Sequence, residues 1–477
     1  MDYETVVGLE IHAELSTETK IFCSCGTGFG ASPNSQVCPV CLGMPGALPA
    51  LNERVLRFAV IAGLALNCEI SGRVEFDRKH YFYPDLPKSY QISQRFNPLC
   101  QKGHVDFDCG GEPRRADILE IHMEEDAGKL IHDSSSGLTL VDFNRAGVPL
   151  IEIVTEPSFR SAAEASAFIE ELRGILTCLG VSDCKMQEGS LRVDVNVSVR
   201  PAGSPEMGVR SELKNLGSVR AVRQAIEYES GRQRELLNSG FPIVQETRRW
   251  DEDKGRSFAM RAKTDSEGYL YMPEPELPAL ALTAEYISGV EADIPELPAA
   301  KRSRYVNRCA LAEADARLLA SNARIAELFE MTANISGNAR ESANIVTGEI
   351  LRLISAAGIT PDTMRFDEKK LADIVQMISA GRINRSSAKL LTERLFIDNI
   401  DPKEYAAAQD LFMVTDAAAI EQAVIDTLRE NAGAVQDYKN GKEKAALALM
   451  GAVMRELGGR ADPAVVNEIL RKNLARK

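Results

Sequence analysis

The first residues that could do chemistry are two carboxylates and an imidazole near the N-terminus. The segment Val7–Leu15 alternates apolar side chains with Glu10, His12 and Glu14. Because successive side chains of a strand point to opposite faces, these three polar groups share one face. Such groups suit a divalent cation or a phosphate-bearing substrate. An ordinary amphipathic strand with a charged outer face is the alternative, and this segment alone leaves both open.

Other segments present polar groups in the same way. Leu119–Glu124 repeats the Leu-Glu-Ile-His-x-Glu pattern of the first segment and continues into Glu125. Glu152 lies among apolar neighbours, where a carboxylate is costly to bury unless it is paired or binds a metal. Leu191–Arg200 alternates throughout, and Glu212 follows in a similar short segment. Each segment alone is more often structural, but together they predict a polar concavity with acidic metal ligands.

A second group of candidate metal ligands consists of cysteines. Cys23, Cys25, Cys38 and Cys41 form two close pairs separated by a loop rich in Gly, Ser and Asn. Four thiolates at this spacing can enclose a tetrahedral Zn²⁺, which then has no open position for water or substrate. A redox dithiol at Cys38 and Cys41 is the rival interpretation, but it leaves the other pair unexplained. We therefore predict a structural zinc in residues 23–41.

The segment Phe76–Gln91 combines three tyrosines with three cationic side chains and is interrupted by two prolines. Aromatic rings between Lys and Arg residues suit a single-stranded nucleic acid or a nucleotide, through stacking and phosphate contacts. An unspecialised surface loop is the alternative, although such a loop seldom holds so many aromatic residues.

Length and composition limit the classes of protein to consider. A chain of 477 residues exceeds a single core and predicts two to four domains. No apolar run approaches the length of a membrane span, and the first residues lack a signal-peptide pattern, so we expect a soluble, cytoplasmic protein without membrane contact. The net charge of −13 argues against a general nucleic-acid coat protein but permits a local basic patch.

The elements that must position these residues differ along the chain. Up to about residue 290 the pattern is β-rich, with strands expected over Thr5–Leu15, Leu119–Met123, Leu138–Phe143 and Leu191–Arg200, and helices over Ala162–Leu179 and from Ser218 to Leu237. A Pro-rich connection at Met272–Pro278 precedes a largely helical part. A weaker break at Asn399–Pro402 divides that part, whose end is basic and could contact nucleic acid or be a solvated helical surface.

Several common catalytic motifs are absent from the sequence. It has no phosphate-binding Gly-x-x-x-x-Gly-Lys-Ser/Thr loop, no Gly-x-Ser-x-Gly turn and no His-Glu-x-x-His pattern. It also lacks a Gly/Ser-rich amidase segment with a partnering lysine.

Taken in order, the motifs resemble those of the family formed by the B subunits of bacterial tRNA-dependent amidotransferases. The similar pieces cover essentially the whole chain and are Val7–His12, Phe76–Gln94, His122–Lys129, Asn144–Pro157, Glu188–Arg200, Glu212–Leu216, Gln245–Arg249, Pro273–Leu277, Tyr438–Lys442 and Ala461–Leu470. So many motifs in the same order make a chance resemblance negligible.

The resemblance implies an α+β architecture. Residues 1–294 would form a cradle-shaped catalytic domain with a mixed, largely antiparallel sheet and helices. Residues 295–405 would form an all-α helical domain, and residues 406–477 a small helical tail of the YqeY type that binds tRNA.

The resemblance also implies a ligase reaction. ATP phosphorylates the side-chain carboxylate of Glu-tRNA(Gln) or Asp-tRNA(Asn), and ammonia then displaces the phosphate. A metal held by strand carboxylates can bridge the ATP phosphates without a P-loop. The implied cofactors are ATP and Mg²⁺, beside the Zn²⁺ expected from the cysteine spacing. The implied partners are an amidase (A) subunit, which would supply the ammonia, and a small C subunit.

Site residues are assigned by the matching motifs. The implied catalytic and magnesium-binding residues are Glu10, His12, Glu125, Glu152 and Glu212. Those implied for the acceptor end and the nucleotide are Lys79, Tyr81, Tyr83, Lys88 and Ser89. The family motif points to Glu125 and not to Glu120 or Glu124, which the internal repeat would suggest.

The sequence departs from the family pattern at Asn215–Val219 and Gly268–Met272, so the resemblance does not define the substrate contacts near residues 217 and 270. The four cysteines are not universal in the family, so the zinc prediction depends on their spacing in this chain. The alternative function is a non-catalytic, zinc-stapled RNA-binding scaffold, which has no need of clustered carboxylates facing one cavity.

Overall fold

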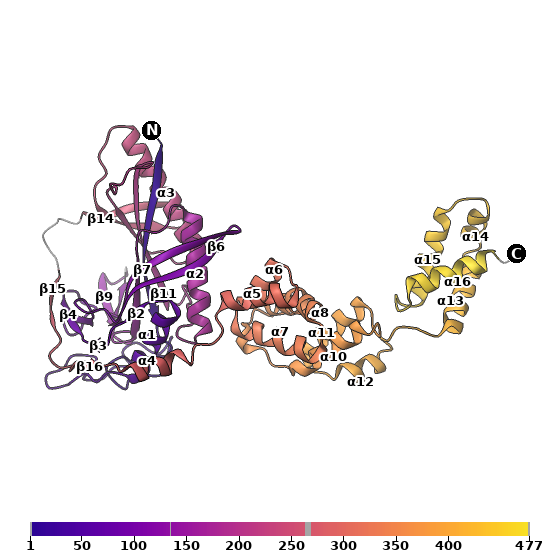
Figure 1. Ribbon diagram of the computed structural model, residues 1–477, viewed down its shortest axis with the longest axis horizontal. Helices are drawn as coiled ribbons and strands as arrows, with labels where there is room; N and C mark the ends of the chain where they lie inside the picture. Colours follow the sequence, from indigo (N-terminus) through magenta and orange to yellow (C-terminus); the bar gives the residue numbers. More distant parts are fainter. Residues whose placement is uncertain (1, 134, 263–268, 476–477) are drawn as a thin grey trace. The chain divides into compact units, whose positions relative to one another are not determined.

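In the computed structural model, residues 2–133, 135–262 and 269–475 are described. The chain forms two compact units, Met1–Pro298 and Ala299–Lys477. The first unit is built around strands and the second consists of helices, as the sequence-coloured ribbon shows (Figure 1). The predicted α+β class, a mixed sheet with helices followed by a helical part, is confirmed.

A nine-stranded sheet forms the centre of the first unit, as far as the described residues show. Its first strand along the chain, β1 (Tyr3–Glu14), lies in the middle of the sheet. In spatial order the strands are β14 (Arg256–Ala262), β13 (Glu246–Asp251), β12 (Ser211–Lys214), β11 (Leu191–Pro201), β1, β10 (Pro149–Thr155), β7 (Glu112–Glu125), β6 (Cys100–Cys109) and β2 (Glu69–Ile70). The pair β12–β13 is parallel, and the other neighbouring pairs are antiparallel.

One face of this sheet is apolar because its strands alternate. Leu9, Ile11 and Ala13 of β1 are fully buried in the main core. The core also takes side chains from α1 (Glu53–Ala65), α2 (Ala162–Cys178) and α3 (Val219–Asn238). The hydroxyls of Ser161 and Ser218 accept hydrogen bonds from backbone amides at the starts of α2 and α3, which fixes where these helices begin. The opposite face of the sheet is left to polar side chains.

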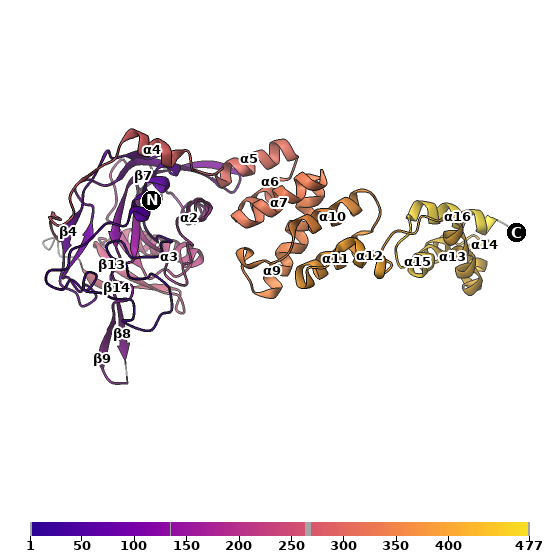
Figure 2. The same cartoon turned by 90° about the horizontal axis from the view of Figure 1, so that it is seen from below.

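Three smaller sheets complete the described part of the first unit. They consist of β15 (Leu270–Pro273), β4 (Asp77–His80) and β5 (Tyr90–Ser93); of β16 (Leu280–Ala281) and β3 (Arg73–Val74); and of β8 (Lys129–Asp133) and β9 (Leu138–Asp142). The β8–β9 ribbon projects from the rest of this unit (Figure 2). Helix α4 (Ala284–Glu291) follows β16.

The individual elements predicted from periodicity are confirmed, with ends that differ by a few residues. The four expected strands are parts of β1, β7, β9 and β11, and the two expected helices are α2 and α3. Strand β7 is much longer than predicted. Its first half is polar, so it lacks the apolar alternation from which the strand was predicted. The Pro-rich segment contains the end of β15, where Pro273 is tolerated because β15 is an edge strand. Gly268, in the segment that departs from the family pattern, lies outside the described residues.

The second unit contains two hydrophobic clusters. The first, around Tyr305, Phe329 and Leu391, joins α5 (Pro298–Cys309), α6 (Glu313–Ala320), α7 (Ala323–Ser336), α8 (Ala339–Ile345), the π-helix Val346–Ile350, α9 (Leu351–Ala357), α10 (Glu368–Ser379), α11 (Arg385–Asp398) and α12 (Pro402–Ala408). A short helix, Pro361–Thr363, connects α9 and α10. The second, around Val424 and Val453, joins α13 (Ala417–Glu430), α14 (Ala432–Lys439), α15 (Lys444–Glu456) and α16 (Pro463–Ala475). Within the described residues, no helix is both long and apolar enough to cross a membrane.

Candidate functional site

The polar face of the large sheet is assembled by cross-strand register. His12 of β1 lies opposite Glu152 of β10 on one side and Arg192 of β11 on the other. Glu152 in turn lies opposite His122 of β7. Directly opposed residues of an antiparallel pair project from the same face, so four strands contribute one row of charged groups.

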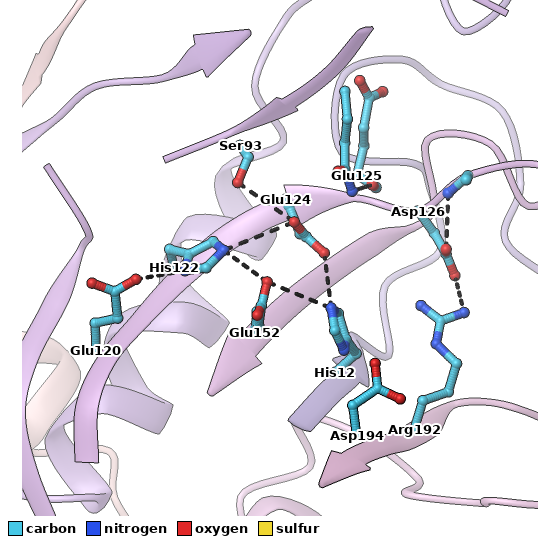
Figure 3. A network of polar contacts seen from close by, with 12 residues as sticks. His12, Ser93, Glu120, His122, Glu124, Glu125, Asp126, Glu152, Arg192 and Asp194 are labelled. Atoms are coloured by element: carbon cyan, nitrogen blue, oxygen red, sulfur yellow. Dashed lines mark hydrogen bonds and ion pairs between the residues drawn. The ribbon is translucent and has the colours of Figure 1, made fainter. Parts of the chain in front are cut away.

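The most enclosed part of this face is a cluster of His12, His122, Glu124 and Glu152 (Figure 3). The His12 Nε2 atom lies 3.4 Å from Glu124 Oε1 and 3.5 Å from Glu152 Oε2. The His122 Nε2 atom lies 3.1 Å from Glu152 Oε2 and 3.8 Å from Glu124 Oε2. Ser93 of β5 donates a hydrogen bond of 3.5 Å to Glu124. Each carboxylate therefore lies within reach of both imidazoles.

The charges in this cluster stabilise one another. Burial alone would lower the pKa of His12, but its hydrogen bonds with Glu124 and Glu152 outweigh burial and raise the pKa to about 10. The same opposing effects raise the pKa of His122 to about 10. Burial tends to raise the pKa of Glu124, while the two imidazoles lower it to about 2. The contacts within the cluster therefore favour the protonated form of both imidazoles and the ionised form of both carboxylates.

A second cluster lies on the same face, one row further along β1. Oxygen atoms of Glu10, Asp194 and Glu212 all lie within 4.8 Å of one another. Asn196 donates a hydrogen bond of 2.9 Å to Glu10, and the Lys214 ammonium lies 2.6 Å from Asp194 and 2.9 Å from Glu212. Burial, and next the charge of Glu152, raises the pKa of Glu10. A bound cation would relieve this crowding of negative charge.

Glu125 does not belong to either cluster. It follows Glu124 in β7, so its side chain points to the other face of that strand. There its Oε1 atom lies 2.5 Å from the Lys88 ammonium and accepts a hydrogen bond of 2.8 Å from the Ile92 amide. Both groups line a cavity of about 180 Å³ that also borders Cys41. Of the five magnesium-site candidates, the structure brings together Glu10 and Glu212, brings His12 to Glu152, and separates Glu125 from both pairs.

The predicted substrate-binding residues lie around β4. Lys79 is close to the first cluster: burial opposes its charge, but Glu124 and Glu152 outweigh burial and raise its pKa. Burial, and next the charges of Asp85 and Glu124, raise the pKa of Tyr81. Tyr83 is exposed. Lys88 pairs with Glu125 as described, and Ser89 follows it in a turn with a left-handed φ of 61°.

The predicted zinc ligands are close together. One sulfur atom from each of Cys23, Cys25, Cys38 and Cys41 lies within 4.8 Å of the other three. The hydrogen bond with Cys23 lowers the pKa of Cys41 to about 4, and the Lys20 ammonium acts in the same direction. Lys20 itself is fully buried, with its Nζ atom 3.6 Å from Cys41 Sγ and 3.3 Å from the carbonyl oxygen of Phe143.

The three clusters offer different donor atoms and therefore suit different metal ions. Mg²⁺ prefers oxygen ligands, so the all-carboxylate cluster of Glu10, Asp194 and Glu212 fits it best. The cluster of His12, Glu124 and Glu152 offers mixed nitrogen and oxygen donors. Four sulfur atoms fit Zn²⁺.

Three residues of these clusters are not among the predicted site residues: Glu124, which the internal repeat suggested and the family motif set aside, His122 and Asp194. Glu124 and His122 stand in the repeat of the first segment, and strand alternation would have placed them on one face. Asp194 stands in the alternating segment Leu191–Arg200. The alternation of that segment places Asp194 on its polar face. The pairing of β11 with β1, which puts Asp194 opposite Glu10, brings it to the cluster.

Known protein families match both units of the chain. A family model described as the GatB/GatE catalytic domain matches residues 5–288, and one described as the GatB domain matches residues 327–474. The chain is 47% identical over 474 residues to the B subunit of the aspartyl/glutamyl-tRNA(Asn/Gln) amidotransferase of Lachnoclostridium phytofermentans, with 99% of both chains covered. It is 49% identical over 477 residues, again with 99% of both chains covered, to the protein of that name from Caldicellulosiruptor saccharolyticus. These matches confirm the resemblance inferred from the motifs.

Proposed function

Because the chain belongs to the family of aspartyl/glutamyl-tRNA(Asn/Gln) amidotransferase B subunits, we propose that it activates the side-chain carboxylate of Glu-tRNA(Gln), Asp-tRNA(Asn) or both. The carboxylate attacks the γ-phosphorus of ATP, and ADP leaves. Ammonia then attacks the carbonyl carbon of the acyl phosphate, and inorganic phosphate leaves as the amide forms. The chain is thus the ligase component of a larger enzyme.

The observation that carries this proposal is the pair of carboxylate clusters on one face of the sheet. Phosphoryl transfer needs little covalent chemistry from the protein, but it needs a place where a cation is held in a fixed position to neutralise the negative charge of the phosphates. Glu10, Asp194 and Glu212 on one side and His12, Glu124 and Glu152 on the other provide such a place. A protein that only holds RNA has no use for six such groups, which disfavours the scaffold alternative.

The implied Mg²⁺ would be held by the cluster of Glu10, Asp194 and Glu212, and the His12 cluster would lie beside it. When bound, Mg²⁺ supplies charge neutralisation for the phosphate oxygens. Asn196 and Lys214 hold the carboxylates in place through their hydrogen bonds. Glu125, predicted as a ligand, is instead proposed to orient Lys88.

We propose that the acceptor end of the tRNA and the nucleotide bind around β4. We assign Lys79 and Tyr81 to the acceptor end, because both lie against the Tyr269 ring and the charge of Glu124 acts on both. Tyr83, Lys88 and Ser89 remain candidates for contacts with the acceptor end or the nucleotide. The four cysteines are proposed to hold a structural Zn²⁺ that fastens the loop over residues 23–41 to the sheet.

The chain needs partners for the second half of the reaction. The sequence has no amidase motif, so we propose that ammonia comes from an amidase (A) subunit, with a small C subunit in the same complex. We retain the division into residues 1–294, 295–405 and 406–477, with tRNA contacts made by the basic tail. Because its substrates are charged tRNAs, we propose that it acts in the cytoplasm.

The test is an assay of the reconstituted complex with each misacylated tRNA in turn, together with glutamine and ATP. Formation of Gln-tRNA or Asn-tRNA is expected, and failure with both substrates contradicts the proposal. Glu10→Gln and Glu152→Gln should abolish amide formation while tRNA binding persists. A scaffold would keep full activity in both variants.

A further inference from the structure

Four aromatic rings form a continuous ladder in the first unit. The ring centroids of Tyr81 and Tyr269 are 5.4 Å apart, those of Tyr269 and Tyr271 are 6.5 Å apart, and those of Tyr271 and Phe96 are 6.5 Å apart. The rings come from three separate segments of the chain. None of Tyr269, Tyr271 and Phe96 was among the predicted site residues.

The ladder borders the carboxylate clusters because of the register of the three-stranded sheet. Tyr271 of β15 pairs with Lys79 of β4, and Lys79 pairs with Gln91 of β5. These opposed residues share one face, and Ser93, two residues beyond Gln91, donates its hydrogen bond to Glu124. The face that carries Tyr271 is therefore the one turned toward the His12 cluster.

The ladder is not a hydrophobic core. Tyr269 is 54% exposed and Phe96 is 65% exposed, whereas the aromatic group of Phe107, Phe159 and Phe168 on the other side of the large sheet is buried. The planes of neighbouring ladder rings are tilted by 58°, 88° and 70°. The rings therefore do not stack on one another, and exposed ring surface remains for a ligand.

Two cations accompany the rings. The Lys79 ammonium lies 4.9 Å from the centre of the Tyr269 ring, and the Arg95 guanidinium lies 5.9 Å from that of Tyr271. Neither cation forms an ion pair within the described part of the chain. Aromatic rings with interleaved cations are the pattern that binds single-stranded nucleic acid, with bases on the rings and phosphates on the cations.

We propose that Tyr81, Tyr269, Tyr271 and Phe96 form a stacking surface for the unpaired 3′ nucleotides of tRNA, with Lys79 and Arg95 as phosphate contacts. This inference rests on the proposed function and specifies how the acceptor end is guided to the carboxylate face. A single ring would suffice for the base of a mononucleotide. A row of four rings suits successive bases, so the ladder favours the RNA end over the base of ATP.

The test compares two forms of the same uncharged tRNA, one with an intact 3′ end and one without its unpaired terminal nucleotides. Binding of each to the reconstituted complex is measured for the wild type and for the double variant Tyr269→Ala/Phe96→Ala. Both residues are exposed and lie outside the strands, so the fold should be retained. The variant should bind the intact tRNA at least ~10-fold more weakly and bind the shortened tRNA with unchanged affinity.

Phe258→Ala is the matched control. Phe258 is also exposed and has Lys254 and Arg256 near its ring, but it stands on β14 and has no aromatic neighbour in the described residues. This variant should leave both affinities unchanged. Tyr269→Phe, which keeps the ring, should bind both tRNAs as the wild type does.

The stacking surface is ruled out if Tyr269→Ala/Phe96→Ala leaves the affinity for intact tRNA unchanged or weakens both tRNAs equally. It is also ruled out if the wild type does not distinguish the two tRNAs. Amide formation in the wild-type complex is measured separately. If amide forms and the ladder variants bind normally, only the stacking surface is wrong. If the ladder discriminates the tRNAs and no amide forms, only the proposed function is wrong.

Discussion

Among single residues, Asp194 offers the sharpest test of the proposed magnesium site. It contributes an oxygen to the cluster with Glu10 and Glu212, and it holds the Lys214 ammonium at 2.6 Å. Its replacement by Asn keeps the size of the side chain and removes the negative charge. The replacement should therefore weaken Mg²⁺ binding and leave the fold unchanged.

We expect Asp194→Asn to lower ATP-dependent amide formation by roughly 10²-fold, with a higher Mg²⁺ concentration needed for half-maximal rate. Rates are measured across a Mg²⁺ titration of the reconstituted complex. Asp183→Asn is the control, because Asp183 forms an ion pair with Lys185 at the surface and should leave the rate unchanged. An Asp194→Asn complex with wild-type rate and Mg²⁺ dependence would remove this cluster from the mechanism.

Glu229 of α3 is the clearest residue with a purely structural role. It is fully buried, and it accepts hydrogen bonds from Arg232 and Gln233 while Arg248 lies 3.4 Å away. Burial tends to raise the pKa of Glu229, but these donors outweigh it and lower the pKa. A lowered pKa in the folded state stabilises the fold above the ordinary pKa of Glu, and this contribution is lost as the pH falls below it.

Glu229→Gln should lower the free energy of unfolding of the first unit by about 2–4 kcal/mol at pH 7. It removes one of the two carboxylates that face Arg232 and Arg248 and leaves these cations with Glu246 alone. The difference from the wild type should shrink as the pH falls below about 4.3. Urea unfolding is followed by the fluorescence of Trp250, the one tryptophan of the chain, which is buried against Tyr228 of α3. Glu227→Gln, in an exposed pair with Arg223, should change little.

At the level of elements, the polar face shows what a sequence can predict. Alternation within β1 is enough to place Glu10 and His12 on one face, and the same rule applied to β7 separates Glu124 from Glu125. The register that places Asp194 opposite Glu10 depends on strands far apart in the chain, and no local pattern encodes it. The aromatic ladder was missed for the same reason, since its rings meet only after β15 pairs with β4.

The cysteine loop is the element whose structure should depend most on a metal. It contains little regular secondary structure. Asn34 and Gln36 form hydrogen bonds with the segment 141–144, and Lys20 contacts Cys41 beside the four clustered cysteines. Removal of Zn²⁺ with a chelator should increase amide hydrogen exchange over residues 20–50, because the bonds that join the two cysteine pairs through the metal are then lost. Exchange in α2 should stay as it was. Equal protection of the loop with and without chelator, in protein shown to contain zinc beforehand, would contradict the metal's structural role.

At the level of the whole molecule, each unit has its own apolar interior. The described residues of the main core lie within the first unit, and both clusters of the second unit begin after residue 304. Length predicted only that the chain exceeds a single core, and periodicity predicted the change from strands to helices. The boundary between the units depends on which helices pack into the same core. The sequence pattern does not show which helices these are.

A fragment of residues 299–477 should therefore fold by itself. We expect strong helical circular dichroism and cooperative thermal unfolding, because each of its apolar clusters is filled by residues of the fragment. Fragment 1–298 should likewise keep the buried environment of Trp250. A fragment 299–477 without cooperative unfolding would mean that its helices need the first unit.

The central place of β1 has a consequence for synthesis. β1 is made first, yet both its neighbours, β10 and β11, come from beyond residue 148. While the ribosome makes the intervening chain, the apolar face of β1 with Leu9, Ile11 and Ala13 has no strand partners. These long-range pairings make folding of the first unit slow and late. The strand that carries Glu10 and His12 is thus the first part of the site to be translated and among the last to be fixed in place.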